Sequence, residues 1–305
     1  MRDTYTNTLI EIAKENPELV VFDADLIGAS GLAAFKKAFP DRAFDCGIQE
    51  ANMTGVAAGM SESGAIPVIH TFSCFASRKI VDQVFLSASY ANLNLKIIGS
   101  DPAISAQTNG GSHQGMEDMG IYLGLHDITL VDLTDAVMAK AVIPKLVEEY
   151  GVVYMRAFRR GEDNIYEEGT EFTVGKGLVL RDGDDATIIA SGLEVKEALD
   201  AADILEEKGI SVRVIDMFTW KPLDRELIVE SAKKTGAIVV AENHSLGNGL
   251  GKQVAAVTAE ECPVPMGFIG VDYYGEVGNV QYLKERFHMT GADIAAKVEA
   301  TIAKK

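Results

Sequence analysis

The stretch FDCGIQEANMTGVAAGM, residues 44–60, joins a short strand-like run to a helical pattern of small side chains. Alanine and glycine on a helix let other backbone approach closely, so the sequence predicts a tightly packed, buried helix over residues 50–63. Glu50 is the exception, because its carboxylate stands at the first position of that helix. A carboxylate at this position is stabilised by the positive end of the helix dipole, which would be a structural role. It can also be an acid that is kept from water for a chemical task.

Outward from this stretch, strand-like apolar runs alternate with helical patterns along the chain. The expected strands are residues 19–26, 65–72, 94–101, 128–133 and 151–158, followed by 186–192, 211–217, 237–243 and 266–271. The expected helices are residues 3–16, 50–63, 77–91 and 134–150, followed by 194–208, 223–234, 249–259 and 290–305. This alternation predicts an α/β fold with mostly parallel sheets that are covered on both faces.

A polar connection over residues 159–177 interrupts the alternation and predicts a domain boundary. We expect a first domain over residues 1–165, a linker over 166–180 and a second domain over 181–305. The segment RDGDDA, residues 181–186, is typical of a turn between strands. The glycine-rich segment SLGNGLG, residues 245–251, predicts a turn and a helix start, and an anion site is the less favoured alternative.

Composition narrows the classes of partner and location. The 305 residues include 45 acidic and 28 basic side chains, a formal net charge of −17, which disfavours nucleic acid and anionic membrane surfaces as partners. Cys46, Cys74 and Cys262 lack metal-ligand spacing and favour reduced thiols in a cytoplasmic protein. The first twenty residues lack the apolar core of a signal peptide. No apolar run approaches the roughly 20 residues of a membrane span.

Residues with useful chemistry gather after the expected strands of the first half. Ligands of parallel α/β sheets bind beyond the carboxyl ends of the strands. The residues found at such ends are Asp25, Glu50, Phe72, Phe75, Asn109, His113 and Arg159. The second half has no comparable collection, so we expect the site in the first domain.

Four sequence blocks resemble the transketolase family of thiamine diphosphate enzymes. They are DADLIGAS (23–30), FDCGIQEANMTGVAAGM (44–60), HTFSCFASRKIVDQV (70–84) and TNGGSHQGMEDMGIYLGL (108–125), in the family's order and spacing. The resemblance runs from about Arg2 to the C-terminus and covers the family's C-terminal half. It implies a pyrimidine-binding domain followed by a transketolase C-terminal-type domain. The implied reaction transfers a two-carbon ketol unit from a ketose phosphate to an aldose phosphate.

The resemblance gives Glu50 a chemical role. It matches the family glutamate at ring atom N1′ of the cofactor, which allows the cofactor's own 4′-amino group to take the thiazolium C2 proton. A carboxylic acid shielded from water fits this task. Phe72 and Phe75 match the aromatic residues that line the aminopyrimidine ring. Asp25 and Leu26 match positions that also approach the cofactor.

Other matches concern the sugar substrate. His113 matches a histidine that hydrogen-bonds the substrate near the reacting carbon, and it is expected to be catalytic with Glu50. Asn109 stands where the family often has aspartate, and Ser100 where it often has histidine. Both are expected to bind substrate, and these departures leave open a different or modified sugar phosphate.

The resemblance also implies a grip on the substrate phosphate. Arg2, Ser30 and Arg159 match positions that hold this group, with Arg160 as an adjacent candidate. A guanidinium suits the role because its planar fork is permanently charged. A frayed terminal position is the alternative for Arg2.

The Mg²⁺ site of the family is missing from the sequence. Thiamine enzymes hold the diphosphate through Mg²⁺ with a Gly-Asp-Gly segment and a later asparagine, and this chain has neither. A full-length transketolase would carry that domain before residue 1. We therefore expect no metal ligands here, and a partner, the N-terminal subunit of a split transketolase, that holds Mg²⁺ and shares thiamine diphosphate. The expected assembly has two copies of each chain, with self-dimerisation of this one.

Three other interpretations stay open. The β subunit of a 2-oxoacid dehydrogenase decarboxylase has the same two domains and the same glutamate, although GGSHQGMEDM (110–119) is closer to the transketolase pattern. A deoxyxylulose phosphate synthase-like enzyme shares the His-Gln-Gly sequence but is normally one long chain. A non-catalytic thiamine-fold protein that binds a partner would not need Glu50 and the aromatic residues.

Overall fold

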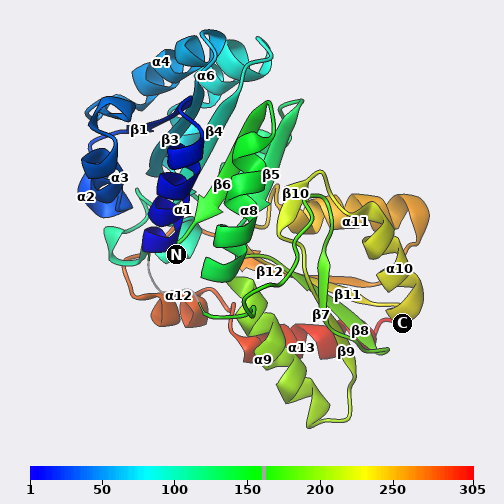
Figure 1. Ribbon diagram of the computed structural model, residues 1–305. Coiled ribbons are helices and arrows are strands. Elements are labelled where there is room, and N and C mark those ends of the chain that lie inside the picture. Colours follow the sequence, from blue (N-terminus) through cyan, green and yellow to red (C-terminus); the bar gives the residue numbers. More distant parts are fainter. Residues whose placement is uncertain (160–162) are drawn as a thin grey trace.

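The computed structural model describes residues 1–159 and 163–305, and Figure 1 labels its elements. Within these residues the chain forms a seven-stranded and a five-stranded sheet. The first sheet has the order β10-β5-β6-β4-β3-β1-β2, and only β10 is antiparallel to its neighbour. Its strands are β1 (Leu19–Asp23), β2 (Ala43–Asp45), β3 (Ile66–Phe72), β4 (Leu95–Ser100), β5 (Ile128–Asp132), β6 (Val152–Ala157) and β10 (Thr219–Lys221).

Helices cover both faces of the first sheet. One face carries α1 (Arg2–Glu15), α3 (Ala33–Ala38) and α8 (Ala136–Glu148), which pack against one another. The other face carries α4 (Glu50–Glu62), α5 (Phe75–Arg78), α6 (Val81–Gln83), the π-helical η2 (Val84–Ser89) and α7 (Asp118–Leu123). The short elements α2 (Ile27–Ser30), η1 (Pro40–Arg42) and η3 (Ala103–Asn109) lie in the connections.

The second sheet has the order β12-β11-β8-β9-β7, with β7 antiparallel to β9. Its strands are β7 (Leu178–Arg181), β8 (Ala186–Ala190), β9 (Val212–Asp216), β11 (Ile238–Ser245) and β12 (Met266–Val271). Its helices are α9 (Glu194–Glu206) and α13 (Gly291–Ile302) on one face, α10 (Arg225–Thr235) and α11 (Leu250–Glu261) on the other, and α12 (Val280–Arg286), which contacts η3 (Figure 1). The predicted two-domain α/β class, with mostly parallel sheets, is confirmed.

Local sequence explains where several helices begin. The side chains of Asp135 and Asp224 accept backbone N–H groups in the first turns of α8 and α10. At α13, Thr290 and Asp293 form the reciprocal hydrogen bonds of a capping box, as their spacing predicts. Residues 181–186 form the predicted turn, because β7 ends at Arg181 and β8 begins at Ala186.

The prediction of one helix over residues 77–91 is wrong. The chain forms α5, α6 and η2 there, because the fully buried Ile80 has φ −125° and ψ −2°, outside the helical range. In η2 the Tyr90 N–H bonds the Phe85 carbonyl at 2.8 Å, five residues back. The expectation that the helix at 50–63 is buried holds for only one face of α4. Its other face, with Gly55, Val56 and Gly59, is exposed.

Strand β10 ties the two units together. It follows β9 in sequence but pairs with β5, so a segment of the second unit completes the first sheet. Trp220 in this strand is fully buried, and its Nε1 donates to the Ser191 hydroxyl at 3.1 Å. Each hydrophobic core also continues across both units. The division at residues 166–180 stays a prediction, and no helix of the described residues is long and apolar enough to cross a bilayer.

Candidate active site

Glu50 begins α4 as a buried carboxylate, and among the described residues Lys79 is its cationic partner. Its side chain is 4% exposed, and the Lys79 Nζ donates to its two carboxylate oxygens at 3.0 and 3.1 Å. The Thr54 hydroxyl donates to the Glu50 carbonyl at 2.9 Å and fixes the first turn. The position combines the positive end of a helix dipole with an ammonium, and both favour negative charge.

Aromatic rings line the approach to this carboxylate. Phe72 ends β3 and Phe75 begins α5, and their ring centroids lie 6.2 Å apart. His113 stands edge-on to both rings at 5.8 and 5.3 Å. The Lys79 ammonium lies 4.3 Å from the Phe75 centroid, so Lys79 joins the rings to Glu50. The structure therefore brings four predicted residues into one continuous set of contacts.

The loop that carries His113 needs glycine to lie this close. A Cβ on Gly115 would stand 2.8 Å from the Cys74 backbone nitrogen, which is tighter than real contacts allow. A Cβ on Gly111 would stand 2.6 Å from the Gly275 carbonyl oxygen. On the second unit's side, the Gln114 amide donates to the Glu276 carbonyl at 2.9 Å. The loop is thus held between the end of β3 and residues 272–278.

Arg159 extends the same set of contacts beyond Phe72. Its guanidinium lies 4.6 Å from the Phe72 centroid and pairs with the Asp101 carboxylate, which also accepts the Arg159 backbone N–H at 3.0 Å. Asp101, Asn109 and Arg159 line a small cavity of about 140 Å³. Asp101 and Gln107 have φ of 51° and 53°, a strained backbone that commonly marks functional loops. Arg160 lies outside the described residues.

Ser100 and Asn109 have different surroundings, because Asn109 lines this cavity and Ser100 does not. Ser100 ends β4 with a buried hydroxyl that donates to the Thr71 carbonyl at 3.4 Å. Asn109 ends η3 and is exposed at the cavity. Of the two residues, Asn109 is therefore the one that presents its side chain to solvent, and the substrate roles of both stay predictions.

The predicted residues of the N-terminal segment lie on adjoining turns. Arg2 is 42% exposed, bonds Asp3 at 3.0 Å and packs against Gly31, directly after Ser30. Met1 reaches the Arg159 segment, because its sulfur accepts the Phe158 N–H at 3.5 Å. The Ser30 hydroxyl is buried and bonded to its own turn, donating to the Ile27 carbonyl at 3.2 Å.

Asp25 and Leu26 follow β1 as predicted. Asp25 is exposed with φ 63°, and its N–H donates to the Asp45 carboxylate at 3.0 Å. The Leu26 N–H donates to the Asp23 carboxylate, and its side chain is half-buried. Their approach to a cofactor stays a prediction.

Sequence reasoning missed Lys79 and Asp101. Lys79 follows Phe75 by four residues, which is helical spacing and a usable signal, but its pairing with Glu50 spans 29 positions. Asp101 pairs with Arg159 across 58 positions. No local sequence pattern predicts such pairs, because their partners lie far apart along the chain.

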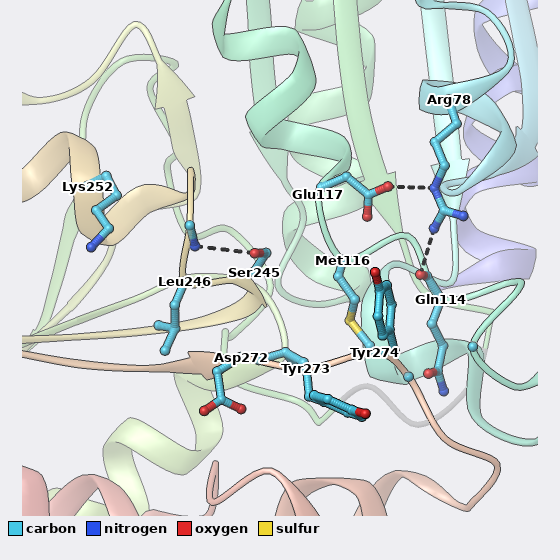
Figure 2. A pocket seen from close by; sticks show the side chains of 14 residues that line it. Arg78, Gln114, Met116, Glu117, Ser245, Leu246, Lys252, Asp272, Tyr273 and Tyr274 are labelled. Atoms are coloured by element: carbon cyan, nitrogen blue, oxygen red, sulfur yellow. Dashed lines mark hydrogen bonds and ion pairs between the residues drawn. The ribbon is translucent and has the colours of Figure 1, made fainter.

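A second cavity of about 900 Å³ adjoins the Glu50 contacts without including Glu50, Phe72 or His113. Arg78 donates to Glu117 and to the Gln114 carbonyl at 2.6 and 3.0 Å. Figure 2 shows Lys252 of the second unit on the opposite side of this cavity. Arg78 is thus already engaged by its own chain. We place the candidate site at Glu50, because the buried carboxylate, the rings and His113 meet there.

The less favoured anion site at residues 245–251 is filled by the chain itself. The Glu242 carboxylate accepts the N–H groups of Leu250 and Gly251 at 2.7 and 3.0 Å, at the start of α11. Burial raises the pKa of Glu242 to about 7, although these two hydrogen bonds lower it. The favoured prediction of a turn and helix start is confirmed.

The residues present fit the aminopyrimidine part of thiamine diphosphate. The Lys79 ammonium shows that the Glu50 carboxylate accepts an N–H donor in this position. Phe72 and Phe75 supply flat apolar surfaces beside it. Among the described residues, no group of three or more His, Cys, Asp or Glu side chains is arranged to hold a metal ion.

Comparison with protein families gives two adjoining matches. Residues 1–161 match the transketolase pyrimidine binding domain, and residues 175–294 match the transketolase C-terminal domain. Together they cover most of the chain.

Three individual proteins extend this match. The chain is 45% identical to the 6-deoxy-6-sulfo-D-fructose transketolase subunit SqwH of Clostridium sp. (strain MSTE9), over 100% of this chain and 95% of that protein. It is 34% identical to a subunit of the apulose-4-phosphate transketolase of Phocaeicola vulgatus, over 88% and 86%. A solved structure described as a split gene transketolase, inactive beta4 tetramer, has a TM-score of 0.92 and 40% identity, over 99% and 98% of the two chains.

Proposed function

The chain belongs to the transketolase family, and from this premise we propose that it is the C-terminal subunit of a split, thiamine diphosphate-dependent transketolase. Relatives of similar length are named as transketolase subunits, which supports the proposal. The observation that carries it is the set of contacts from Glu50 through Lys79, Phe75 and His113 to Phe72. We infer that the subunit works with a partner in ketol transfer.

We propose the following tasks for the predicted residues of the site. Thiamine diphosphate, when bound, supplies the carbon nucleophile of the reaction. Glu50 would hold or move a proton at ring atom N1′, and Phe72 and Phe75 would line the ring and keep water away. Asp25 and Leu26 would approach the cofactor from the end of β1. His113 stands against both rings, where it would hydrogen-bond the substrate near the reacting carbon.

The substrate grip is proposed for the far side of Phe72. Arg159 would bind the anionic end of a ketose there, with Arg2 and Ser30 on adjoining turns and with Asn109 and Ser100 nearby. The relatives are named for a sulfonated ketose and for a sugar phosphate, and both carry a distal anion. We propose a donor with a terminal phosphate, as the sequence resemblance implies, and a terminal sulfonate as the second candidate because of the more similar relative.

A partner chain is proposed for the diphosphate. The sequence lacks the Gly-Asp-Gly segment and the later asparagine, so Mg²⁺ would be held by an N-terminal transketolase subunit. Self-association would use the exposed face of α4 with Val56, beside Phe85 and Leu86 of η2, which are 44%, 45% and 57% exposed. A tetramer of chains is the described state of the similar structure. We propose two copies of each chain in the active assembly.

A cytoplasmic location is proposed from cysteine chemistry. Cys46, Cys74 and Cys262 are all free thiols. Free thiols are typical of a reducing compartment.

The test is reconstitution with a partner of the N-terminal type, recovered by co-purification from the native organism. We expect the assembled complex to turn over a ketose phosphate or sulfonate and to show two copies of each chain by light scattering. Glu50→Gln should nearly abolish turnover and exchange of the thiazolium C2 proton, because an amide cannot give and recover the N1′ proton. Glu62→Gln, exposed at the other end of α4, is the matched control.

The exchange rate decides the role of Glu50. Exchange at the wild-type rate in Glu50→Gln would show that this residue is not the proton partner. Tight thiamine diphosphate binding by the isolated chain in calorimetry would contradict the split site. Turnover of pyruvate in preference to sugars would favour a 2-oxoacid decarboxylase.

A further inference from the structure

Lys79 is the cation that contacts the Glu50 carboxylate. Its Nζ donates to both oxygens at 3.0 and 3.1 Å, while its side chain remains 44% exposed. The ammonium also lies over the Phe75 ring, 4.3 Å from the centroid. A buried carboxylate therefore depends on a lysine whose other side faces solvent.

The other charged side chains on the elements packed against α4 either bond other groups or face solvent. Asp23 on β1 pairs with His70 on β3 at 3.2 Å. Lys96 on β4 donates to the carbonyls of Glu149 and Gly151. Asp82 on α6 is exposed. Lys79 is thus the group positioned to set the charge of Glu50.

The same geometry conflicts with the proton task of Glu50. The ammonium bonds both oxygens and favours the ionised carboxylate, whereas the task at N1′ requires the carboxyl group to hold a proton, so Lys79 must move off at least one oxygen. The long, half-exposed side chain of lysine can move toward solvent along the Phe75 ring without disturbing α4.

We propose that Lys79 is a positioning residue that holds Glu50 ionised in the cofactor-free subunit and releases it when the aminopyrimidine ring binds. This inference rests on the proposed function. Lys79 keeps its own proton when it moves out. The proton that Glu50 and ring atom N1′ then share comes from solvent, so cofactor binding takes up about one proton per site at neutral pH.

The pairing is tested first in the isolated full-length chain, without cofactor. Lys79→Met keeps the length of the side chain and removes its charge, and we expect its unfolding temperature at pH 8 to fall by about 2–4 °C. The loss should be smaller when Glu50→Gln is already present, and Lys79→Arg should restore most of it. Lys14→Met, which breaks the exposed pair with Glu11, should cause no measurable change.

The release is tested in the assembled complex by calorimetric titration with thiamine diphosphate in two buffers of different ionisation enthalpy. Wild-type and Lys79→Arg complexes should take up nearly the same number of protons at pH 7. Lys79→Met should take up clearly fewer, because no ammonium then holds the buried carboxylate ionised before binding.

Two results separate this inference from the proposed function. Equal proton uptake by the wild-type and Lys79→Met complexes, or additive effects of Lys79→Met and Glu50→Gln on unfolding, would overturn the role of Lys79 and leave the function standing. Failure of the wild-type complex to bind thiamine diphosphate would overturn the proposed function and, with it, the release.

Discussion

Two sites of this chain pair buried carboxylates with a cation, and they differ in how far the cation is exposed to solvent. At the candidate site, Glu50 is paired with Lys79, which is 44% exposed. Between the two units, Arg156 bonds Asp118 and Asp132, and all three side chains are at most 1% exposed. The Arg156 guanidinium also donates to the Asn243 carbonyl at 3.2 Å. The first pair can open toward solvent, whereas the second is closed on every side.

The electrostatics follow this difference in enclosure. Burial alone would raise the pKa of Asp118, but the Arg156 guanidinium outweighs it and holds that pKa below the ordinary value. The pKa of Asp132 stays raised, because burial outweighs its weaker bond to Arg156 at 3.3 Å. Arg156 thus stabilises the ionised form of Asp118 more than that of Asp132. We infer that this cluster holds the units together, while the Glu50 pair is built for release.

The largest expected effect comes from removing the fixed cation. Arg156→Met leaves Asp118 and Asp132 buried without a counter-charge, and we expect a loss of about 3–5 kcal/mol in the free energy of unfolding. Guanidinium chloride unfolding of the isolated chain measures it. Arg225→Met is the matched control, because that arginine pairs with Glu260 and Glu261 in solvent and its loss should be hard to detect. Equal effects in both variants would erase the distinction between fixed and releasable pairs.

A smaller, pH-dependent effect is expected at Glu194, where the second unit buries a carboxyl group. Neither carboxyl oxygen has a hydrogen-bond partner among the described residues, and burial raises the pKa to about 8, an effect partly offset by Lys284. Between about pH 4.5 and 8 the folded state therefore still holds a proton that the unfolded chain has already released. Stability from this group is complete at low pH and is lost as the pH rises through that window.

Glu194→Gln removes the titration, so its unfolding free energy should fall less between pH 5 and pH 8 than that of the wild type, by ~3.5 kcal/mol. Denaturant titrations at both pH values measure the difference. Glu207→Gln, exposed just beyond α9, should keep the wild-type slope. Parallel slopes for Glu194→Gln and wild type would mean that Glu194 is ionised in the folded chain.

The sequence predicts the framework of this site better than its charges. Four blocks within residues 23–125 predict where Glu50, Phe72, Phe75 and His113 lie along the fold, because strand ends and glycine-rich loops have local signals. Their contact in the structure follows from the parallel order of β1, β3 and β4. Their chemical roles stay predictions.

Pairs that form across long separations could not be predicted. Lys79 meets Glu50 across 29 positions, and Arg156 meets Asp118 across 38, so each depends on the packing of whole elements. Strand β10 has three residues and pairs with a strand far back in the sequence, which leaves no periodicity to detect. The sequence also does not separate the exposed face of α4 from its buried face, because both carry small residues.

The smallest expected effect concerns Arg159, which stands between the two kinds of pair. It is 15% exposed, so it is less enclosed than Arg156 and less free than Lys79. A charge-assisted hydrogen bond contributes about 1.5–3 kcal/mol. Asp101 already takes part of this charge, so we expect Arg159→Ala in the assembled complex to raise KM for fructose 6-phosphate only about tenfold. Hydroxypyruvate, which has no distal anion, should keep its KM.

A second substitution at Asp101, the partner of Arg159, tests the role of Arg159 more sharply. In Arg159→Ala the Asp101 carboxylate is left facing the substrate anion and repels it, so adding Asp101→Asn should recover part of the lost affinity. A 6-sulfonated donor should follow the same order with a smaller change, because a sulfonate carries less charge than a phosphate. Lys252→Ala, in the neighbouring cavity, is the control and should leave all three donors unchanged. Equal losses on hydroxypyruvate and on the anionic donors would place Arg159 with Arg156, as a residue that holds the fold.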